Sequence, residues 1–282
     1  MKKNKYCRRN IILIIIAFII GLTAFNIVYP DVSVLKSENP DKTAFMEHRE
    51  DQWKKEGKNY KIRQTWVPLS RISPYLIRAV LIAEDDKFYK HEGFDYEAMQ
   101  KALEKDIKEK KFKLGGSTIS QQLAKNLYLS PSKNPIRKLR EALITLRMER
   151  AINKKRILEL YLNVAEWGDK GIFGIEAASR HYYGKPASAL SPEEASRLAS
   201  VLPNPIKFNP LGGSKYVINR SRLIYSIMVK RGIVVPEEEE IIEESETEQQ
   251  RSQKTDTQPA ETEPKPEPPA VVNTPFDSHP DN

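Results

Sequence analysis

Two polar stretches of the chain, residues 83–95 and 115–126, carry the side chains best suited to chemistry. The first contains several carboxylates, a histidine and aromatic side chains, and it follows an apolar segment. The second contains two glycines, hydroxyl and amide side chains, and a lysine. A carboxylate can act as a general base, while glycine-rich backbone, amides and cations bind anions. We therefore expect a base from the first stretch and a binding surface for a phosphorylated sugar from the second.

Glu84 is distinguished from the other carboxylates by its position at the end of a predicted helix. That helix should begin with Ser73 as N-cap and Pro74 in the first turn. Glu84 lies at helical spacing from Ile77 and Leu81, so it extends their apolar stripe. Partial burial and the negative end of the helix dipole would both raise its pKa, which suits a general base. The alternative is an ordinary helix-end acid that faces solvent.

The second stretch predicts a capped helix that presents a cation. Thr118 and Gln121 have the spacing of a capping box, so a helix should begin near Ile119 and end near Leu129. Gln121 and Lys125 are four residues apart and share one face of this helix. The glycines before it favour an anion site at the helix N-terminus, but this pattern alone has little specificity.

A further helix, expected from about Ile136, carries charged side chains at helical spacing. Arg137 and Glu141 are four residues apart, and Lys138 lies one step round the helix. They are either part of a site or an ordinary surface ion pair, which contributes only about a few tenths of a kcal/mol. The residues of this helix expected to face the core are Leu139, Leu143 and Leu146.

Charge is distributed unevenly along the 282 residues. The formal net charge is +8, but residues 237–282 carry 14 acidic and 3 basic side chains, and the remainder carries 24 acidic and 43 basic ones. A body this basic should bind an anionic partner, which could be nucleic acid, an anionic membrane or a phosphorylated substrate. The single cysteine, Cys7, excludes an intramolecular disulfide.

The N-terminus predicts a membrane anchor. A basic segment, residues 1–10, precedes an uncharged run at residues 11–29, which is just long enough to cross a hydrocarbon core of roughly 30 Å. A cleaved signal peptide is the alternative, but the run is longer than the apolar region typical of such peptides. The basic flank keeps the N-terminus in the cytoplasm and places the rest of the chain outside. We therefore expect the membrane, and not nucleic acid, as a partner.

The body of the chain is predicted to be mainly α-helical, with no strand-rich region. Residues 30–42 are expected to be a linker and residues 43–235 a folded domain. Residues 236–282 are rich in Glu, Pro and Thr, and this composition predicts a disordered tail. Further helices are expected at about 157–163, 192–202 and 215–231.

The motifs together resemble the five signatures of the peptidoglycan glycosyltransferases, glycosyltransferase family 51. They occur in the family's order and cover about residues 43–232. A run with the pattern Trp167-Gly168…Gly171-Ile172-Phe173-Gly174 is similar to the monofunctional biosynthetic branch. The five segments are Glu84-Asp85-x-x-Phe88-x-x-His91-x-Gly93-x-Asp95, Gly116-x-Thr118-Ile119-x-Gln121-Gln122-x-x-Lys125-Asn126, Arg137-Lys138-x-x-Glu141, Ile157-Leu158-Glu159-x-Tyr161-Leu162-Asn163 and Glu194-Ala195-x-Arg197-Leu198-Ala199.

This resemblance implies a lysozyme-like domain with a head lobe and a smaller, membrane-embedded jaw. Members of the family polymerise lipid II into linear β-1,4 glycan strands, with inversion at C1 of the donor and release of undecaprenyl pyrophosphate. The implied location is the bacterial cytoplasmic (inner) membrane, with a single pass, the N-terminus inside and the catalytic domain outside. The implied partners are lipid II, the growing glycan chain and the membrane, and then other cell-wall synthesis or division proteins.

The resemblance also implies roles for individual residues. Glu84 matches the base that deprotonates the acceptor's 4-hydroxyl, and Glu141 matches a second essential acid that organises the cations or the donor. Lys125 and Arg137 match the cations that bind pyrophosphate, and Lys138 would support them. The residues implied to line the donor groove are Ser117, Thr118, Gln121, Gln122 and Asn126. The residues implied to shape the loop around Glu84 are Asp85, Phe88 and His91.

One position departs from the family pattern. Lys133 stands where family members often carry arginine. A lysine still neutralises phosphate, but it lacks the bidentate fork of arginine. No metal-ligand cluster is visible in the sequence, so no cofactor is expected to be required. Some members of the family use Mg²⁺ or Mn²⁺ near the pyrophosphate.

Three alternative functions remain open at this point. A lysozyme-like enzyme that cleaves peptidoglycan would also use acidic residues, but it needs neither an anchor nor the cations Lys125 and Arg137. A bifunctional penicillin-binding protein would need a long downstream domain with a Lys-Thr-Gly motif, and the sequence contains no such motif. An inactive membrane-anchored scaffold would not need the intact motif residues.

Overall fold

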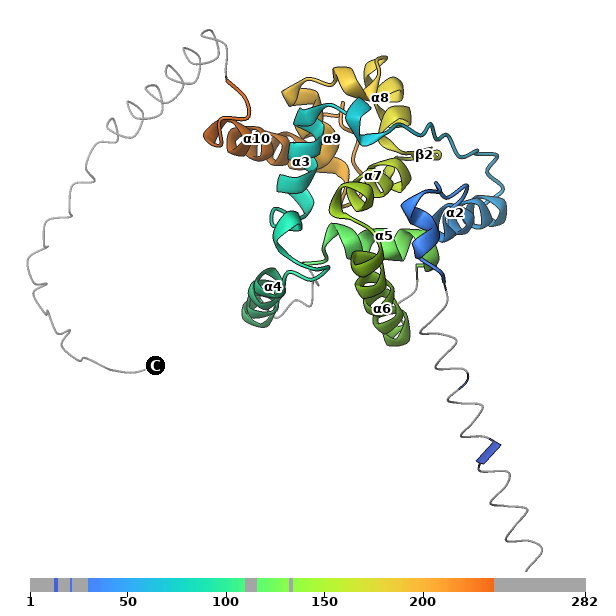
Figure 1. The fold of residues 1–282 in the computed structure, drawn as a ribbon. Helices are drawn as coiled ribbons and strands as arrows, with labels where there is room; N and C mark the ends of the chain where they lie inside the picture. The colour runs from blue at the N-terminus through green and yellow to red at the C-terminus, as the bar shows by residue number, and fades with distance from the viewer. Residues whose placement is uncertain (1–12, 15–20, 22–29, 110–115, 132–133, 236–282) are drawn as a thin grey trace, which may run out of the picture. The chain divides into compact units, whose positions relative to one another are not determined.

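The computed structural model describes residues 13–14, 21, 30–109, 116–131 and 134–235 (Figure 1). Within them the regular secondary structure is almost entirely helical, with one short antiparallel strand pair, so the mainly α-helical prediction is confirmed. The elements in chain order are η1 (Ser33–Lys36), α2 (Ala44–Lys55), η2 (Leu69–Arg71), α3 (Pro74–Glu84), η3 (Phe88–Lys90), α4 (Tyr96–Glu109), α5 (Ile119–Tyr128), α6 (Pro135–Ala151), α7 (Lys154–Val164), β1 (Glu166–Gly168), β2 (Ile172–Phe173), α8 (Ile175–Tyr183), η4 (Ala187–Ala189), α9 (Pro192–Val201) and α10 (Lys215–Lys230).

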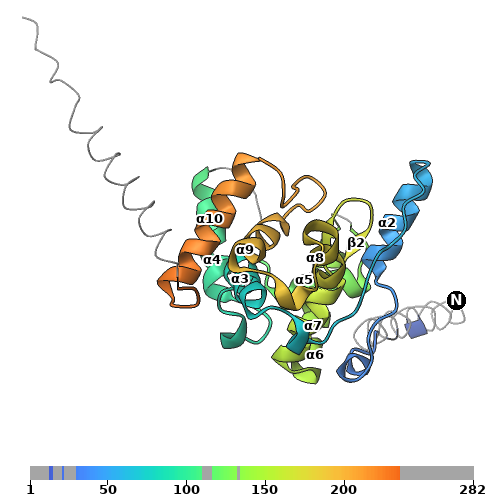
Figure 2. The ribbon, with the colours of Figure 1, turned by 90° about the horizontal axis from the view of Figure 1, so that it is seen from above.

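Two groups of packed helices form the body (Figures 1 and 2). In the first group, α5 packs against α2, α6 and α7. The last five residues of α7, from Leu160 to Val164, are all buried, so this helix lies at the centre of the core. In the second group, α3 packs against α9 and α10. Glu84 ends a helix of the second group, whereas Lys125 lies on a helix of the first, so the site forms where the groups meet.

The predicted linker, residues 30–42, is packed against this body. Val32 and Leu35 belong to the main hydrophobic core. Arg156 on α7 donates from Nε to the carbonyl of Leu35 at 2.8 Å and from Nη2 to the carbonyl of Glu38 at 2.7 Å. The aliphatic side chains of this short segment, Val32, Val34 and Leu35, form no periodic pattern, so the packing could not be predicted from sequence.

The predicted membrane span lies almost wholly outside the described residues. Of residues 11–29, the structure describes only Leu13, Ile14 and Gly21. Among the described residues, none of the helices combines the length and the apolar character needed to cross a membrane. The basic segment 1–10 and the predicted tail 236–282 also lie outside the described residues.

The predicted starts of α5 and α3 are both confirmed, but the two N-cap side chains act differently. Thr118 and Gln121 form the capping box at α5. Ser73 does precede Pro74 at the start of α3, but its hydroxyl makes no capping hydrogen bond. It donates instead to the carbonyl of Leu190 at 2.9 Å. A buried carbonyl needs a donor, and this need takes the hydroxyl away from the helix end.

The predicted core face of α6 is also wrong. Leu139 is 63% exposed and Leu146 is exposed as well, while Leu143 is only partly buried. Spacing alone identifies apolar rows on this helix, but it cannot tell which row meets the protein. The residues that α6 buries are Glu141, Ile144, Thr145 and Met148.

Candidate active site

Glu84 lies at the end of α3 with its side chain only 10% exposed. Gln122 on α5 donates from Nε2 to Oε2 of Glu84 at 2.8 Å, and Arg220 on α10 lies 3.7 Å from Oε1. Removal of water raises the pKa of Glu84, while Gln122, Arg220 and Lys125 oppose the rise. The net direction is upward, so Glu84 is a desolvated carboxyl and not a solvent-facing acid. Such a group suits proton abstraction near neutral pH.

A buried tyrosine fixes the orientation of the Gln122 amide. Tyr161 on α7 donates from its hydroxyl to Oε1 of Gln122 at 3.1 Å. With its oxygen engaged in this way, the amide turns its NH₂ group towards Glu84. Burial raises the pKa of Tyr161 well above its ordinary value, so the phenol remains a donor. Two hydrogen bonds, from Tyr161 to Gln122 and from Gln122 to Glu84, therefore connect the base to the core.

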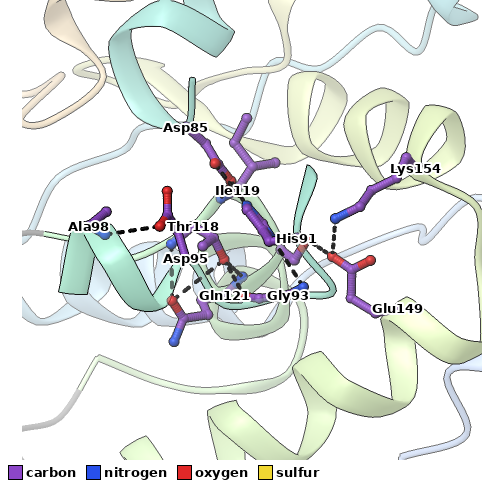
Figure 3. Close-up of polar contacts among 11 residues, drawn as sticks. Asp85, His91, Gly93, Asp95, Ala98, Thr118, Ile119, Gln121, Glu149 and Lys154 are labelled. Atoms are coloured by element: carbon purple, nitrogen blue, oxygen red, sulfur yellow. Dashed lines mark hydrogen bonds and ion pairs between the residues drawn. The ribbon is translucent and has the colours of Figure 1, made fainter. Parts of the chain in front are cut away.

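Asp85 and His91 attach the loop after Glu84 to the start of α5 (Figure 3). Asp85 accepts from the backbone N–H of Ile119 at 2.9 Å, and Nε2 of His91 lies 2.9 Å from the same carboxylate. Gly93 donates its backbone N–H to Nδ1 of His91 at 3.1 Å. Because Nδ1 accepts, the ring proton lies on Nε2, which donates to Asp85. Both side chains thus hold the loop in place.

Thr118 and Gly93 bring the same loop close to α6 (Figure 3). The hydroxyl of Thr118 donates to the carbonyl of Gly93 at 2.7 Å. Gly93 has a φ of 96°, and a Cβ there would lie 2.9 Å from Cγ2 of Thr145. Only glycine therefore permits this backbone conformation and this close approach.

A second polar network lies behind the loop and joins α5, α6 and α7 (Figure 3). Glu149 on α6 accepts from Lys154 on α7 at 2.7 Å and also from the hydroxyl of Ser120 on α5. Nζ of Lys154 lies 4.5 Å from the ring centroid of Phe88, which is completely buried. Phe88 is therefore a packing residue of the loop, and Lys154 covers its ring.

Three cations, Lys125, Arg137 and Lys138, gather round Glu141, and we call them the cation cluster. Glu141 is only 2% exposed. Arg137 donates from Nη1 to Oε2 of Glu141 at 2.9 Å, and Lys138 donates to Oε1. Burial lowers the pKa of Lys125, attraction to Glu141 opposes this, and repulsion from the two α6 cations adds to it. A carboxylate this deeply buried does not belong to an ordinary surface ion pair.

A cavity of about 250 Å³ lies beside Glu84. Ser117 and Thr118 line it from the segment before α5, and Glu97 and Lys101 line it from α4. Two of the predicted groove residues thus border a space next to the predicted base.

The other predicted site residues are placed as follows. Gln121 is buried, and its Oε1 accepts from the backbone N–H of Thr118 in the helix cap. Asn126 is buried on α5. Lys133 lies outside the described residues. Contacts between these side chains and a donor remain predictions, because they concern a bound molecule.

Several residues of this site were not predicted as functional. Tyr161 stands in the fourth family-like motif, so the resemblance could have identified it. Arg220 comes from α10, far along the chain from Glu84, and no spacing rule connects the two. The network of Ser120, Glu149 and Lys154 was missed for the same reason.

No group of three His, Cys, Asp or Glu side chains that could hold a metal ion occurs among the described residues.

The sequence matches a family model described as transglycosylase over residues 51–229, so the chain belongs to this family. A biosynthetic peptidoglycan transglycosylase of Azoarcus sp. (strain BH72) is 50% identical over 196 residues, which are 70% of this chain and 84% of the relative. One from Aromatoleum aromaticum is 52% identical over 192 residues, 67% of this chain and 83% of the relative. One from Dechloromonas aromatica (strain RCB) is 54% identical over 167 residues, 59% and 72% respectively. The family predicted from the motifs is confirmed.

Proposed function

We propose that this chain polymerises lipid II into linear β-1,4 glycan strands of peptidoglycan, with inversion at C1 of the donor and release of undecaprenyl pyrophosphate. Family membership and similarity to relatives named biosynthetic peptidoglycan transglycosylase support this reaction. The observation that carries the proposal is that α5 joins the two parts of the site. Gln122 donates to Glu84 at 2.8 Å, and Lys125, three residues further along the same helix, is attracted to Glu141 and to Glu84. A desolvated base and a cation cluster are therefore close enough to act on one substrate, as transfer from a sugar pyrophosphate requires.

In the proposed reaction, Glu84 takes the proton of the acceptor's 4-hydroxyl while that oxygen attacks C1 of the donor sugar. The bond between C1 and the pyrophosphate oxygen breaks on the opposite face, so the configuration inverts and the pyrophosphate leaves with the bonding electrons. Glu84 must be ionised to accept the proton. The opposing effects of Gln122, Arg220 and Lys125 limit the rise in its pKa and favour that state. A base at this step contributes about 10²–10⁴-fold to the rate.

The cation cluster is proposed to bind the pyrophosphate as it departs. Lys125 and Arg137 would contact its oxygens, with Lys138 and Lys133 in support. Glu141 holds Arg137 and Lys138 in the absence of substrate, which supports a role in organising the cations. Ordered cations stabilise the developing charge without reorganising during the reaction. The growing glycan chain would occupy the donor groove lined by Ser117, Thr118, Gln121, Gln122 and Asn126.

We further propose that the outer faces of α4 and α6 contact the membrane. Tyr96, Met99 and Leu103 are exposed in one row on α4, and Ile136 and Leu139 are exposed on α6. Both helices lie at the same end of the body, the lower end in Figure 1. Exposed apolar rows of this kind are typical of surfaces that meet lipid.

The exposed faces of α4 and α6 support a two-lobed domain that lies against the membrane. In the proposed arrangement α4 and α6 belong to the jaw and the remaining helices to the head of a lysozyme-like domain. Residues 11–29 would cross the bacterial cytoplasmic membrane once, with the N-terminus inside and the catalytic domain outside. Residues 30–42 would connect the anchor to the domain at 43–235, and residues 236–282 would be a tail. Protease digestion of sealed membrane vesicles of each orientation tests the topology.

The proposal includes no required metal ion and no nucleic-acid partner. Mg²⁺ or Mn²⁺ would bind, where used, beside the pyrophosphate. Polymerisation measured in excess EDTA, and again with each ion added back, tests this. Association with other cell-wall synthesis or division proteins is tested by cross-linking in cells.

The central experiment gives the full-length protein lipid II in one reaction and finished peptidoglycan in another. Glu84→Gln should reduce glycan chain growth by about 100-fold or more, because the base is lost. Glu92→Gln is the matched control, since Glu92 is an exposed acid of the same loop, and it should retain activity. Glycan fragments released from peptidoglycan would favour a lysozyme-like hydrolase. Lipid II left intact by the wild type would favour an inactive scaffold, and labelling by a fluorescent penicillin would favour a bifunctional enzyme.

A further inference from the structure

Arg220 on α10 contacts the end of α3 at two points. Its Nη2 donates to the carbonyl of Ala83 at 2.9 Å. The same nitrogen lies 3.7 Å from Oε1 of Glu84, which is an ion pair without a hydrogen bond. The side chain of Arg220 is 31% exposed, against 10% for Glu84, so water screens this attraction only in part. The backbone contact fixes the guanidinium, and the guanidinium then acts on the carboxylate.

The two oxygens of Glu84 have different surroundings. Oε1 is buried and, within the described part of the chain, accepts no hydrogen bond. Oε2 accepts from Gln122 at 2.8 Å. The side chain nevertheless retains some exposure. Since Oε1 is buried, Oε2 is the oxygen of the carboxylate left for contact with a substrate.

We propose that Arg220 is a positioning residue that turns Oε1 of Glu84 inward and supplies positive charge beside it, so that Oε2 is the oxygen that takes the acceptor's proton. This inference rests on the proposed function, in which Glu84 is the base. It adds α10 to a site in which the motifs place the end of α3 with the loop after it, α5, α6 and α7. The hydrogen bond from Nη2 to the carbonyl of Ala83 explains how a partly exposed arginine is held beside Glu84.

The charged and titratable groups around Glu84 come from several elements. Arg220 comes from α10, Lys125 from α5, Tyr161 from α7 and Asp85 from the loop that follows Glu84. The two cations lower the pKa of Glu84, and Arg220 does so more strongly than Lys125. Asp85 raises it slightly. Loss of Arg220 should therefore leave less of Glu84 ionised at a given pH.

The test compares pH profiles of kcat/KM for lipid II polymerisation in three full-length variants. Arg220→Gln removes the charge but keeps an amide donor for the Ala83 carbonyl. Arg222→Gln is the matched control, because Arg222 is exposed on the same helix and the charge change is identical. Arg220→Lys restores a positive charge.

The acidic limb of the profile should move to higher pH in Arg220→Gln. Below the wild-type midpoint the loss should be about tenfold, and on the alkaline plateau less than about threefold, because only the ionised fraction of the base has changed. The limb should stay in place in Arg222→Gln and return towards the wild type in Arg220→Lys. An equal loss at every pH, or a limb that does not move, would overturn the proposal.

A second measurement does not depend on activity. Urea unfolding at about pH 8 gives a double-mutant cycle between Arg220→Gln and Glu84→Gln. Arg220→Gln should destabilise the wild type more than it destabilises the Glu84→Gln variant, because only the former retains the carboxylate. Equal destabilisation in both backgrounds would show that the residues are not coupled and would overturn the proposal. If Arg220→Gln does not fold, Arg220→Lys and Arg220→Met take its place in the cycle. A wild type unable to polymerise lipid II would defeat the proposed function, while the cycle would still decide this inference.

Discussion

Helices α6 and α7 follow one another in the chain but differ in the side chains that they bury and expose. α7 buries apolar residues such as Leu158 and leaves Lys155 exposed. α6 buries Glu141, while Leu139 and Ile136 are 63% and 65% exposed. The pattern of α7 is typical of a helix between a protein core and water. The exposed apolar side chains of α6 are typical of a surface that contacts another protein or a membrane.

This difference shows what apolar periodicity can establish. It identified both helices correctly, because each has residues at helical spacing. It specified no inner face for α7, and the inner face that it predicted for α6 is wrong. On α6 the site requires a buried carboxylate, and the apolar row is left for the surface. Four experiments test this contrast. The first three change residues of the two helices, and the fourth changes the proposed base, Glu84.

The largest effect is expected from truncating one leucine on each helix, the buried Leu158 of α7 and the exposed Leu139 of α6. Leu158→Ala on α7 should lower the free energy of unfolding by about 2–5 kcal/mol, because it leaves a cavity in the core. Leu139→Ala on α6 should change it by less than about 0.5 kcal/mol in detergent. Urea unfolding followed by circular dichroism measures both. Similar losses in the two variants would mean that the outer face of α6 packs against protein.

The next effect concerns the buried face of α6. Glu141→Gln should reduce polymerisation by about 100-fold, because Arg137 and Lys138 lose the carboxylate that orders them. Glu104→Gln is the control, since Glu104 is an exposed acid on α4. Initial rates with lipid II and thermal unfolding should be measured together. A rate loss that follows loss of folded protein would reduce Glu141 to a structural residue.

The exposed face of α6 should contribute to polymerisation only when the protein is in a bilayer. In the double variant Ile136→Ser and Leu139→Ser, polymerisation by protein reconstituted in liposomes should fall about tenfold, since the apolar area available to lipid is reduced. In detergent micelles, where substrate and enzyme mix freely, the same variant should retain activity within about twofold. Equal losses in both media would contradict the proposed membrane contact.

The smallest effect is a stability difference at Glu84. Its pKa is raised in the folded chain, so the folded state binds the proton more tightly than the unfolded state does. Ionisation therefore costs folding free energy as the pH rises above the ordinary value of 4.5. Glu84→Gln removes this cost and should be more stable than the wild type at neutral pH, with the difference shrinking as the pH falls towards 4.5. Urea unfolding across that range decides the sign, and a wild type that is the more stable at neutral pH would contradict it.

Local features of this fold and site could be predicted from sequence, and long-range ones could not. The start of α5 and the end of α3 follow from residues within one or two helical turns. Arg220 reaches the site only because α10 packs against α3, and no local pattern specifies that packing. The packing of residues 30–42 could not be predicted either, since two buried aliphatic side chains, Val32 and Leu35, are too few to form a periodic pattern. The predicted core face of α6 was wrong because spacing identifies apolar rows but not the row that meets the protein.

The contacts of Arg156 determine how the proposed enzyme would meet its substrate. A flexible linker of ten residues would allow an end-to-end distance of about 17–19 Å. Here Val32 and Leu35 are buried, and Arg156 holds the carbonyls of Leu35 and Glu38. The point at which the chain leaves the body, near Pro30, is therefore fixed relative to Glu84. The height of the base above the bilayer would then be set by packing, and lateral diffusion of the lipid-linked units would bring the reactants together.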